Sequence, residues 1–256
     1  MSSEHTDSVY DLFAWFFNRY WGDSFSKDAR PVIEQCLLPH LPAGGRILDL
    51  CCGTGQLSHW LTVCGFRVAG LDISTEMIRF ARENAPTAHF LVADARTFTA
   101  PPVHAAVVST FDSLNHIPTR QELQSVFQNV YESLAPDGLF LFDMNMDQGF
   151  RASAPETYAV VKRDHVCIME SVYHPSRGVG SSNVTLFRLV KGVWQRSDLE
   201  ILEYLYPEEQ VRESLAAAGF EQVLAYDAER DLSMARGEGR LFFLASKGRM
   251  PRDMRP

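Results

Sequence analysis

Short apolar runs alternate with longer stretches of mixed polarity over residues 46–145. The runs are almost entirely apolar, which is typical of strands that are buried on both faces of a parallel sheet. Strands and helices in alternation predict an α/β fold with a doubly wound, Rossmann-like sheet covered by helices on both faces. We predict the strands at 46–50, 66–72, 89–94, 104–110 and 139–144, and the helices at 55–64, 74–85 and 119–138.

Several of these helices carry start and stop signals. Thr119 and Glu122 have the spacing of a capping box, and apolar residues recur after them with the period of an amphipathic helix. Ser74 is expected to be the N-cap of the predicted helix that follows it, residues 75–85. A later helix is predicted to begin at Pro207 and to end at Gly219.

The alternation changes after about residue 149. Looser, strand-like patterns predict an antiparallel sheet of three or four strands inserted after the fifth strand. The N-terminal segment is predicted to form two helices, broken near Gly22 and with Pro31 in the first turn of the second. The expected organisation is a helical N-terminal cap at 1–43, an α/β domain at 44–150 and 206–248, the insertion at 151–205 as a substrate lid or dimer contact, and a disordered tail at 249–256.

Composition narrows the choice of partner. The chain has 256 residues, 46% of them hydrophobic, which is enough for one sizeable core, and its net charge is -8. Nucleic-acid-binding surfaces need excess positive charge, so we expect a small-molecule partner and no nucleic acid. The five cysteines lack CxxC or zinc-site spacing, which favours reduced thiols and no metal. We find no signal-peptide pattern or membrane-spanning run, so we expect a cytoplasmic protein, a monomer or homodimer, with no membrane partner.

The first predicted strand leads into the glycine-containing sequence RILDLCCGTG, residues 46–55. Glycines at such a turn let the backbone approach a ligand, and the next helix presents free N–H groups. Asp72 ends the second strand, 17 residues after Gly55, where a carboxylate can accept hydrogen bonds from both hydroxyls of a ribose. An adenosine-type ligand is therefore expected across the ends of these two strands.

Three features separate a dinucleotide from S-adenosylmethionine as that ligand. The NAD fingerprint requires a third glycine, and Ser58 stands at its position. Asp49, at the tip of the first strand, would repel a pyrophosphate but can receive the ammonium group of a methionine moiety. Asp94 and Ala95, after the third strand, offer a carboxylate and a backbone N–H to the edge of an adenine ring.

The sequences ILDLCCGTGQLS, VAGLDIS, FLVADARTF and LAPDGLFLFDM, in this order and spacing, resemble the successive motifs of class I S-adenosylmethionine-dependent methyltransferases over residues 44–145. The resemblance implies a seven-stranded sheet with an antiparallel last strand, S-adenosylmethionine as cofactor and S-adenosylhomocysteine as product. The chain is similar, more loosely, to the small-molecule branch that includes the aminosugar N-methyltransferases. By position, the expected cofactor site comprises Asp49, Cys51, Gly53, Gly55, Asp72, Ile73, Met77, Asp94, Ala95 and Thr110.

Within this expected site the residues have different roles. Gly53 and Gly55 are expected to line the methionine part, while Ile73 and Met77 pack beside the adenine ring. Cys51 departs from the family, which usually has the first glycine of the loop here. Its Cβ disfavours positive φ, so we expect a slightly reshaped loop that still binds the cofactor.

Catalytic candidates follow the fourth and fifth strands. His116 is the best general base by chemistry because its reference pKa is near neutral; the alternative is a packing role. Asp143 is expected either to orient an amine or to be a structural carboxylate at the strand end. Asp112, Asn115 and Asn145 occupy the same two loops.

The N-terminal segment carries seven aromatic residues in fourteen positions, 9 to 22. It is either a helix packed on the core or a lid over the cofactor, with Tyr10 or Tyr20 offering a hydroxyl to the cofactor carboxylate. The expected function is methyl transfer to nitrogen or oxygen of a small-molecule acceptor by in-line displacement. The alternatives are a non-catalytic or regulatory cofactor-binding protein and an NAD(P)-linked oxidoreductase.

Overall fold

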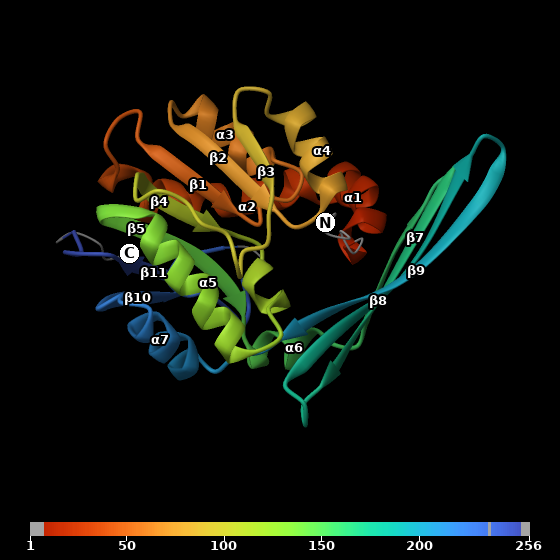
Figure 1. Cartoon of the computed structure of the whole chain (residues 1–256). Helices are drawn as coiled ribbons and strands as arrows, with labels where there is room; N and C mark the ends of the chain where they lie inside the picture. The colour runs from red at the N-terminus through yellow and green to blue at the C-terminus, as the bar shows by residue number, and fades with distance from the viewer. Residues whose placement is uncertain (1–7, 235–236, 252–256) are drawn as a thin grey trace, which may run out of the picture.

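The computed structural model of the chain describes residues 8–234 and 237–251. Most of the tail that the sequence predicts to be disordered, residues 252–256, lies outside the described residues. Within them, no helix combines the length and apolar character needed to cross a membrane. Figure 1 shows a central sheet with helices on both faces and a second, narrower sheet that extends away from it.

The central sheet is seven-stranded, in the order β10-β11-β5-β4-β1-β2-β3. The strands from β3 to β5 are parallel, and β11 lies antiparallel between β5 and β10, which confirms the predicted α/β fold with an antiparallel last strand. The strands are β1 (Arg46–Leu50), β2 (Arg67–Asp72), β3 (His89–Val92), β4 (His104–Ser109), β5 (Leu134–Asn145), β10 (Gln222–Asp227) and β11 (Arg240–Ser246).

Helices cover both faces of this sheet (Figure 1). Apolar residues of α2 (Gly22–Cys36) and α3 (Gln56–Val63) pack with one set of strand residues, and α4 (Thr75–Asn84) lies beside α3. On the opposite face, α5 (Arg120–Ser133) and α7 (Glu208–Ala217) pack over the other set. Burial on both faces explains why the sequence of these strands is continuously apolar.

The predicted caps form in the structure. Ser74 accepts a hydrogen bond from the backbone N–H of Met77 at 3.1 Å, and Thr119 accepts one from Glu122 at 3.2 Å. One expectation was wrong: Pro31 lies inside α2, because that helix begins at Gly22 and not shortly before the proline. The ring leaves the carbonyl four residues earlier without its usual helical donor.

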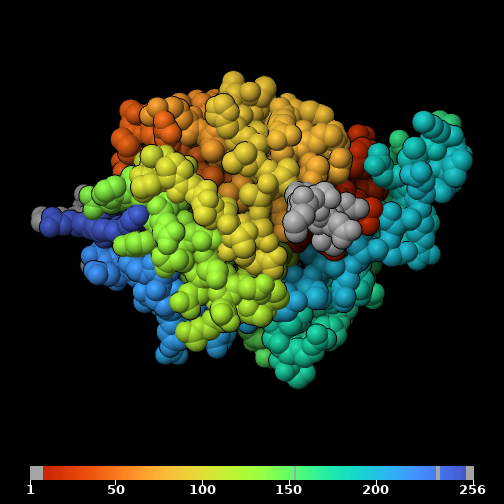
Figure 2. Space-filling model, viewed as in Figure 1, coloured from red at the N-terminus to blue at the C-terminus, as the bar shows by residue number. Residues whose placement is uncertain are grey.

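The insertion forms a four-stranded antiparallel sheet in the order β6-β7-β8-β9. A turn at 175–178 joins β7 to β8, as predicted. The far end of this sheet stands clear of the α/β body beside α1, and its near end joins the body (Figures 1 and 2). The elements are a short helix, α6 (Asp147–Ser153), followed by β6 (Glu156–Val161), β7 (His165–His174), β8 (Val179–Val190) and β9 (Val193–Tyr204).

Helix α1 (Val9–Tyr20) fills the space between the two sheets (Figure 1). Phe13 and Phe16 pack against the inserted sheet, and Ala14 packs with Met77 and Phe80 of α4. The α1 segment is aromatic around its circumference because it has two apolar partners, one on each side.

A single carboxylate fixes α1 to α4. Asp11 Oδ1 accepts hydrogen bonds from Ser74 Oγ at 2.6 Å and from the Glu76 backbone N–H at 3.0 Å, and Oδ2 accepts one from the Ser8 backbone N–H at 3.2 Å. One side chain therefore satisfies orphan groups at the N-termini of two helices.

Replacing Asp11 by Ala should lower the free energy of unfolding by about 1–3 kcal/mol, because it removes acceptors at both helix ends. Urea unfolding measures this change. Asp23→Ala is the matched control, since Asp23 is also a first-turn acid but pairs only with Lys27 on the exposed face of α2. Equal losses in the two variants would contradict the bridging role of Asp11.

Candidate functional site

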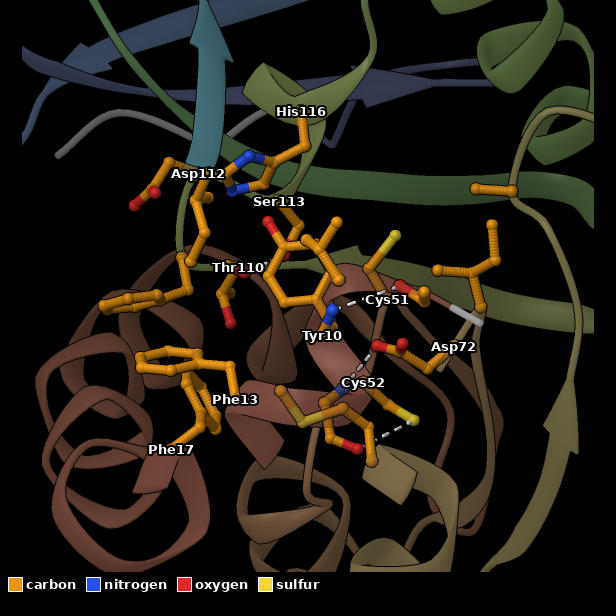
Figure 3. A pocket seen from close by; sticks show the side chains of 18 of the residues that line it. Tyr10, Phe13, Phe17, Cys51, Cys52, Asp72, Thr110, Asp112, Ser113 and His116 are labelled. Carbon is orange, nitrogen blue, oxygen red and sulfur yellow. Dashed lines mark hydrogen bonds between the residues drawn. The ribbon is translucent and has the colours of Figure 1, made fainter. Parts of the chain in front are cut away.

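A cavity of about 610 Å³ opens at the carboxyl ends of β1, β2 and β4. Residues of α1 line one side of the cavity, and the end of β9 lines another. Segments that are far apart in the sequence therefore enclose one space. Figure 3 shows side chains from these segments converging on its interior. The carboxyl edge of a parallel sheet is where ligands of α/β proteins usually bind.

The glycine loop after β1 has a left-handed backbone at three positions. Cys51 has φ 58°, Gly53 has φ 52° and Gly55 has φ 82°. Cys51 therefore takes the positive φ that a glycine would take, at a cost of about 1–2 kcal/mol. Its side chain lines the cavity.

Asp49 is buried at the tip of β1 and lines the same cavity. The Ser58 hydroxyl donates a hydrogen bond to its carboxylate at 2.5 Å. Burial, with a smaller contribution from the charge of Asp72, raises the pKa of Asp49 to about 7 against the opposing effect of the Ser58 hydrogen bond. Ser58, the residue that stands in place of a third glycine, is thus the hydrogen-bond partner of this carboxyl group.

Asp72 holds the glycine loop in place. Its Oδ2 accepts the Gly53 backbone N–H at 2.9 Å and its Oδ1 accepts the Ser74 backbone N–H at 2.9 Å (Figure 3). Burial raises the pKa of Asp72 to about 6, although these two N–H groups lower it. Ile73 and Met77 follow it and line the cavity with apolar surface.

Asp94 and Ala95 also line the cavity, but the Asp94 carboxylate is engaged. Arg96 donates hydrogen bonds to both of its oxygens, at 2.6–3.0 Å, and also to Glu122 at 2.8 Å. Burial would raise the pKa of Asp94, but the contacts with Arg96 outweigh it and lower the pKa. Asp94 therefore faces the cavity as a fixed, ionised group paired with Arg96.

The hydroxyl group of Tyr10 is buried in this cavity and has no hydrogen-bond partner among the described residues. Burial raises its pKa, and the nearby carboxyl groups of Glu203 and Asp112 add to that effect. In Figure 3 the Tyr10 ring lies between Asp72 and His116. An orphaned hydroxyl in a cavity is suited to a ligand.

His116 lines the cavity from a short 3-10 helix, η2 (Ser113–His116), after β4. Its Nδ1 donates a hydrogen bond to the Leu202 carbonyl at 2.7 Å, so Nε2 is the acceptor nitrogen of the neutral ring. Burial lowers the pKa of His116 more than the Asp112 charge raises it. Thr110, at the start of the same loop, is also part of the lining.

Three predicted site residues, Gly55, Tyr20 and Asp143, lie outside the cavity lining. Gly55 packs against α4, since a Cβ at this position would come within 2.8 Å of Ala81 Cα. Asp143 is fully buried behind the loop after β4: it accepts the backbone N–H groups of Phe111 at 2.5 Å and Asp112 at 3.0 Å, and it pairs with Arg240. It supports the loop and does not line the cavity, so its structural interpretation replaces the catalytic one. Tyr20 lies at the other end of α1, where its hydroxyl bonds to His165 of the inserted sheet, outside the cavity lining.

Glu203 is the lining residue that the sequence interpretation missed. It lies near the end of β9, and Asn145 Nδ2 donates a hydrogen bond to its Oε2 at 2.9 Å. Asn115 fixes the same region, since its Nδ2 donates to the backbone carbonyls of Asn145 at 3.0 Å and Tyr204 at 3.1 Å. The available signal was alternation: Glu203 stands two residues after the buried Ile201, on the same face of the strand.

Comparison with known proteins assigns this arrangement to a family. A family of methyltransferase domains matches residues 47–138. A putative methyltransferase of Bacillus subtilis is 31% identical over 214 residues, covering 82% of this chain and 87% of that protein. A Streptomyces venezuelae dTDP-3-amino-3,4,6-trideoxy-alpha-D-glucopyranose N,N-dimethyltransferase is 29% identical, covering 84% of this chain and 90% of that protein.

Solved structures show the same fold. A S-adenosylmethionine-dependent methyltransferase from Clostridium acetobutylicum superposes with a TM-score of 0.75 at 21% identity, covering 94% of this chain and 100% of that chain. An amino pentose methyltransferase from Micromonospora echinaspora, solved with S-adenosylmethionine bound, superposes with a TM-score of 0.67 at 20% identity, covering 96% and 100%.

The raised carboxyl pKa values predict how stability depends on pH. A group whose folded-state pKa is raised contributes stability at low pH that is lost as the pH rises through that pKa. For Asp49 the window runs from the ordinary aspartate pKa, about 4, to its folded-state pKa of about 7, because in this range the group is ionised only in the unfolded chain. The free energy of unfolding of the free protein should therefore fall across this window, and fall less in Asp49→Asn.

Urea unfolding at several pH values measures this slope. Glu34→Gln is the control because Glu34 is exposed on α2 and does not line the cavity. An equal loss of stability between about pH 4 and 7 in Asp49→Asn and in the wild type would contradict this role of Asp49.

Proposed function

The chain belongs to the S-adenosylmethionine-dependent methyltransferases, and on that premise we propose that it transfers a methyl group to a nitrogen or oxygen atom of a small-molecule acceptor by in-line displacement. S-adenosylmethionine is its cofactor. One observation carries the proposal: a single cavity joins the expected cofactor residues to a second group of polar side chains around His116 and Glu203.

The cofactor end of this cavity has the chemistry that the cofactor requires. Each Asp72 oxygen accepts one backbone N–H and keeps a further lone pair for a ribose hydroxyl. The buried Asp49 carboxyl is suited to the ammonium of the methionine part. Tyr10, with its unpartnered hydroxyl, is suited to the methionine carboxylate.

We assign the remaining cofactor contacts in the same way. We assign Gly53, Cys51 and Thr110 to the methionine part of the cofactor, and the apolar lining at Ile73, Met77 and Ala95 to the adenine ring. The left-handed Gly55 contributes indirectly, because it lets the loop pack closely on α4. In this assignment Asp94 does not contact the adenine ring directly, because Arg96 donates hydrogen bonds to both oxygens of the Asp94 carboxylate.

When bound, S-adenosylmethionine supplies an electrophilic methyl group on a sulfonium, so the protein's task is to orient the acceptor and to exclude water. Helix α1 and strand β9 form walls of the cavity that can orient the acceptor and exclude water. We propose the segments 1–43 and 151–205 as the cap over the acceptor. His116 Nε2 is available to take a proton from the acceptor.

The relatives support a small acceptor. The Streptomyces venezuelae relative is named as an N,N-dimethyltransferase of a dTDP-linked aminosugar, and the amino pentose methyltransferase shares the fold. The cavity of about 610 Å³ is of the size in which small-molecule ligands bind.

Calorimetric titration tests the cofactor assignment. S-adenosylmethionine and S-adenosylhomocysteine should bind, and NADH should not. Asp72→Asn should weaken both adenosyl ligands by about tenfold or more, because hydrogen bonds to a charged group are lost. The control is Asp198→Asn, an exposed aspartate of the inserted sheet outside the cavity. NADH binding, or unchanged affinity in Asp72→Asn, would overturn the assignment.

A further inference from the structure

The acceptor end of the cavity is strongly acidic. Six carboxyl side chains line the whole cavity, whereas Arg96 is the one arginine or lysine among the described lining residues. Arg96 is already engaged by Asp94 and Glu122. Asp112 is paired with Arg240 through Oδ1 only, and no ion pair with Glu203 is formed by the described residues. Carboxyl oxygens that are removed from water without a cationic partner favour a positively charged ligand.

Two of these carboxyl groups line the same cavity and are near enough for their charges to interact. Asp112 follows β4 and Glu203 is near the end of β9, and Asp112 is the charge that acts most strongly on Glu203. Tyr10 of α1, with its unpartnered hydroxyl, and His116 of η2 are the other titratable groups at this place. The Tyr10 and His116 rings are 5.5 Å apart between centroids.

The backbone holds Asp112 in a strained conformation. Phe111 has φ 75° and Asp112 has φ 47°, two consecutive left-handed residues that are not glycine. Asp143 accepts both of their N–H groups, and Arg240 bonds Asp112 Oδ1 at 2.7 Å from behind. Strain that is fixed by buried partners is typical of functional sites.

Glu203 is also held in position by a neighbouring polar side chain. Asn145 bonds only one of its oxygens, Oε2, at 2.9 Å, and no hydrogen bond to Oε1 is formed by the described residues. Burial, and then the charge of Asp112, raise the pKa of Glu203 to about 8, against the opposing effect of Asn145. A carboxyl group in this state exchanges a proton near neutral pH.

We propose that the acceptor is a small cationic amine, that Glu203 and Asp112 bind its ammonium group, and that Glu203 accepts the proton that must leave before methyl transfer. This inference rests on the proposed function, because it names the acceptor for the same cavity. His116 Nε2 is the other candidate base at this place, but burial lowers the pKa of His116 and raises that of Glu203, so Glu203 is the stronger base of the two.

The proton and electron balance is simple. The ammonium gives one proton to the Glu203 carboxylate, which leaves a neutral amine with a free electron pair. That pair forms the new carbon–nitrogen bond as the carbon–sulfur bond breaks with its pair on sulfur. The product leaves as a methylated ammonium ion, and Glu203 releases its proton to water.

The first test identifies the acceptor class. A metabolite extract is separated by cation exchange at neutral pH into cationic and non-cationic fractions, and each is incubated with isotope-labelled S-adenosylmethionine and the enzyme. Label should appear on nitrogen in products of the cationic fraction. Label on oxygen overturns the amine assignment, and label on nitrogen only in the non-cationic fraction overturns the assignment of a cationic acceptor. Both results leave methyl transfer intact. No labelled product from any fraction overturns the proposed function, and the amine assignment with it.

The second test concerns Glu203, with the amine identified above. Glu203→Gln should lower kcat/KM by about 100-fold, the usual size of a general-base contribution, and should remove the rise of kcat/KM with pH. Affinity of the amine for the complex with S-adenosylhomocysteine should fall by about tenfold, while affinity for S-adenosylhomocysteine itself stays within about twofold.

Two further variants separate chemistry from folding. Glu170→Gln, an exposed glutamate of the same inserted sheet, should behave as wild type. Glu203→Asp keeps the charge and should recover part of the activity and the pH dependence. If Glu203→Gln retains the wild-type kcat/KM and pH profile, Glu203 does not take the proton.

Discussion

Desolvation of carboxyl groups at the carboxyl edge of the parallel sheet is the constraint on which the rest of the structure depends. Asp49 and Asp72 are buried at the ends of neighbouring strands, and burial raises the pKa of each. Hydrogen bonds from Ser58, Gly53 and Ser74 reduce this cost without removing it. The cofactor brings positive charge to the place where the protein lacks it.

Distant segments of the chain are held at this edge by a few polar side chains. Asp11 fixes α1 to the start of α4, and Asn115 and Asn145 fix the end of β9 to the loops after β4 and β5. His116 adds a further bond to the β9 backbone. The walls of the cavity are thus set by hydrogen bonds between elements, whereas the core of the sheet is set by apolar packing.

Most of the fold and the cofactor end of the site could be predicted from the sequence. Parallel strands end at one edge, so residues at their carboxyl ends, such as Asp49 and Asp72, are brought together whatever the loops do. Tyr20 and Asp143 lie outside the cavity lining, which the sequence could not show because helix rotation and side-chain direction are decided by tertiary packing. Glu203 was missed because the register of the inserted sheet against the body is set by contacts, such as that with Asn145, that no local pattern contains.

A crystal structure of the protein with S-adenosylhomocysteine and an amine tests the account most directly. The account predicts the ribose on Asp72, the methionine amino group toward Asp49, and the sulfur directed at the end of the cavity that holds Asp112 and Glu203, with the amine nitrogen between them. A ligand whose ribose makes no contact with Asp72, or whose sulfur points away from Glu203, would contradict it.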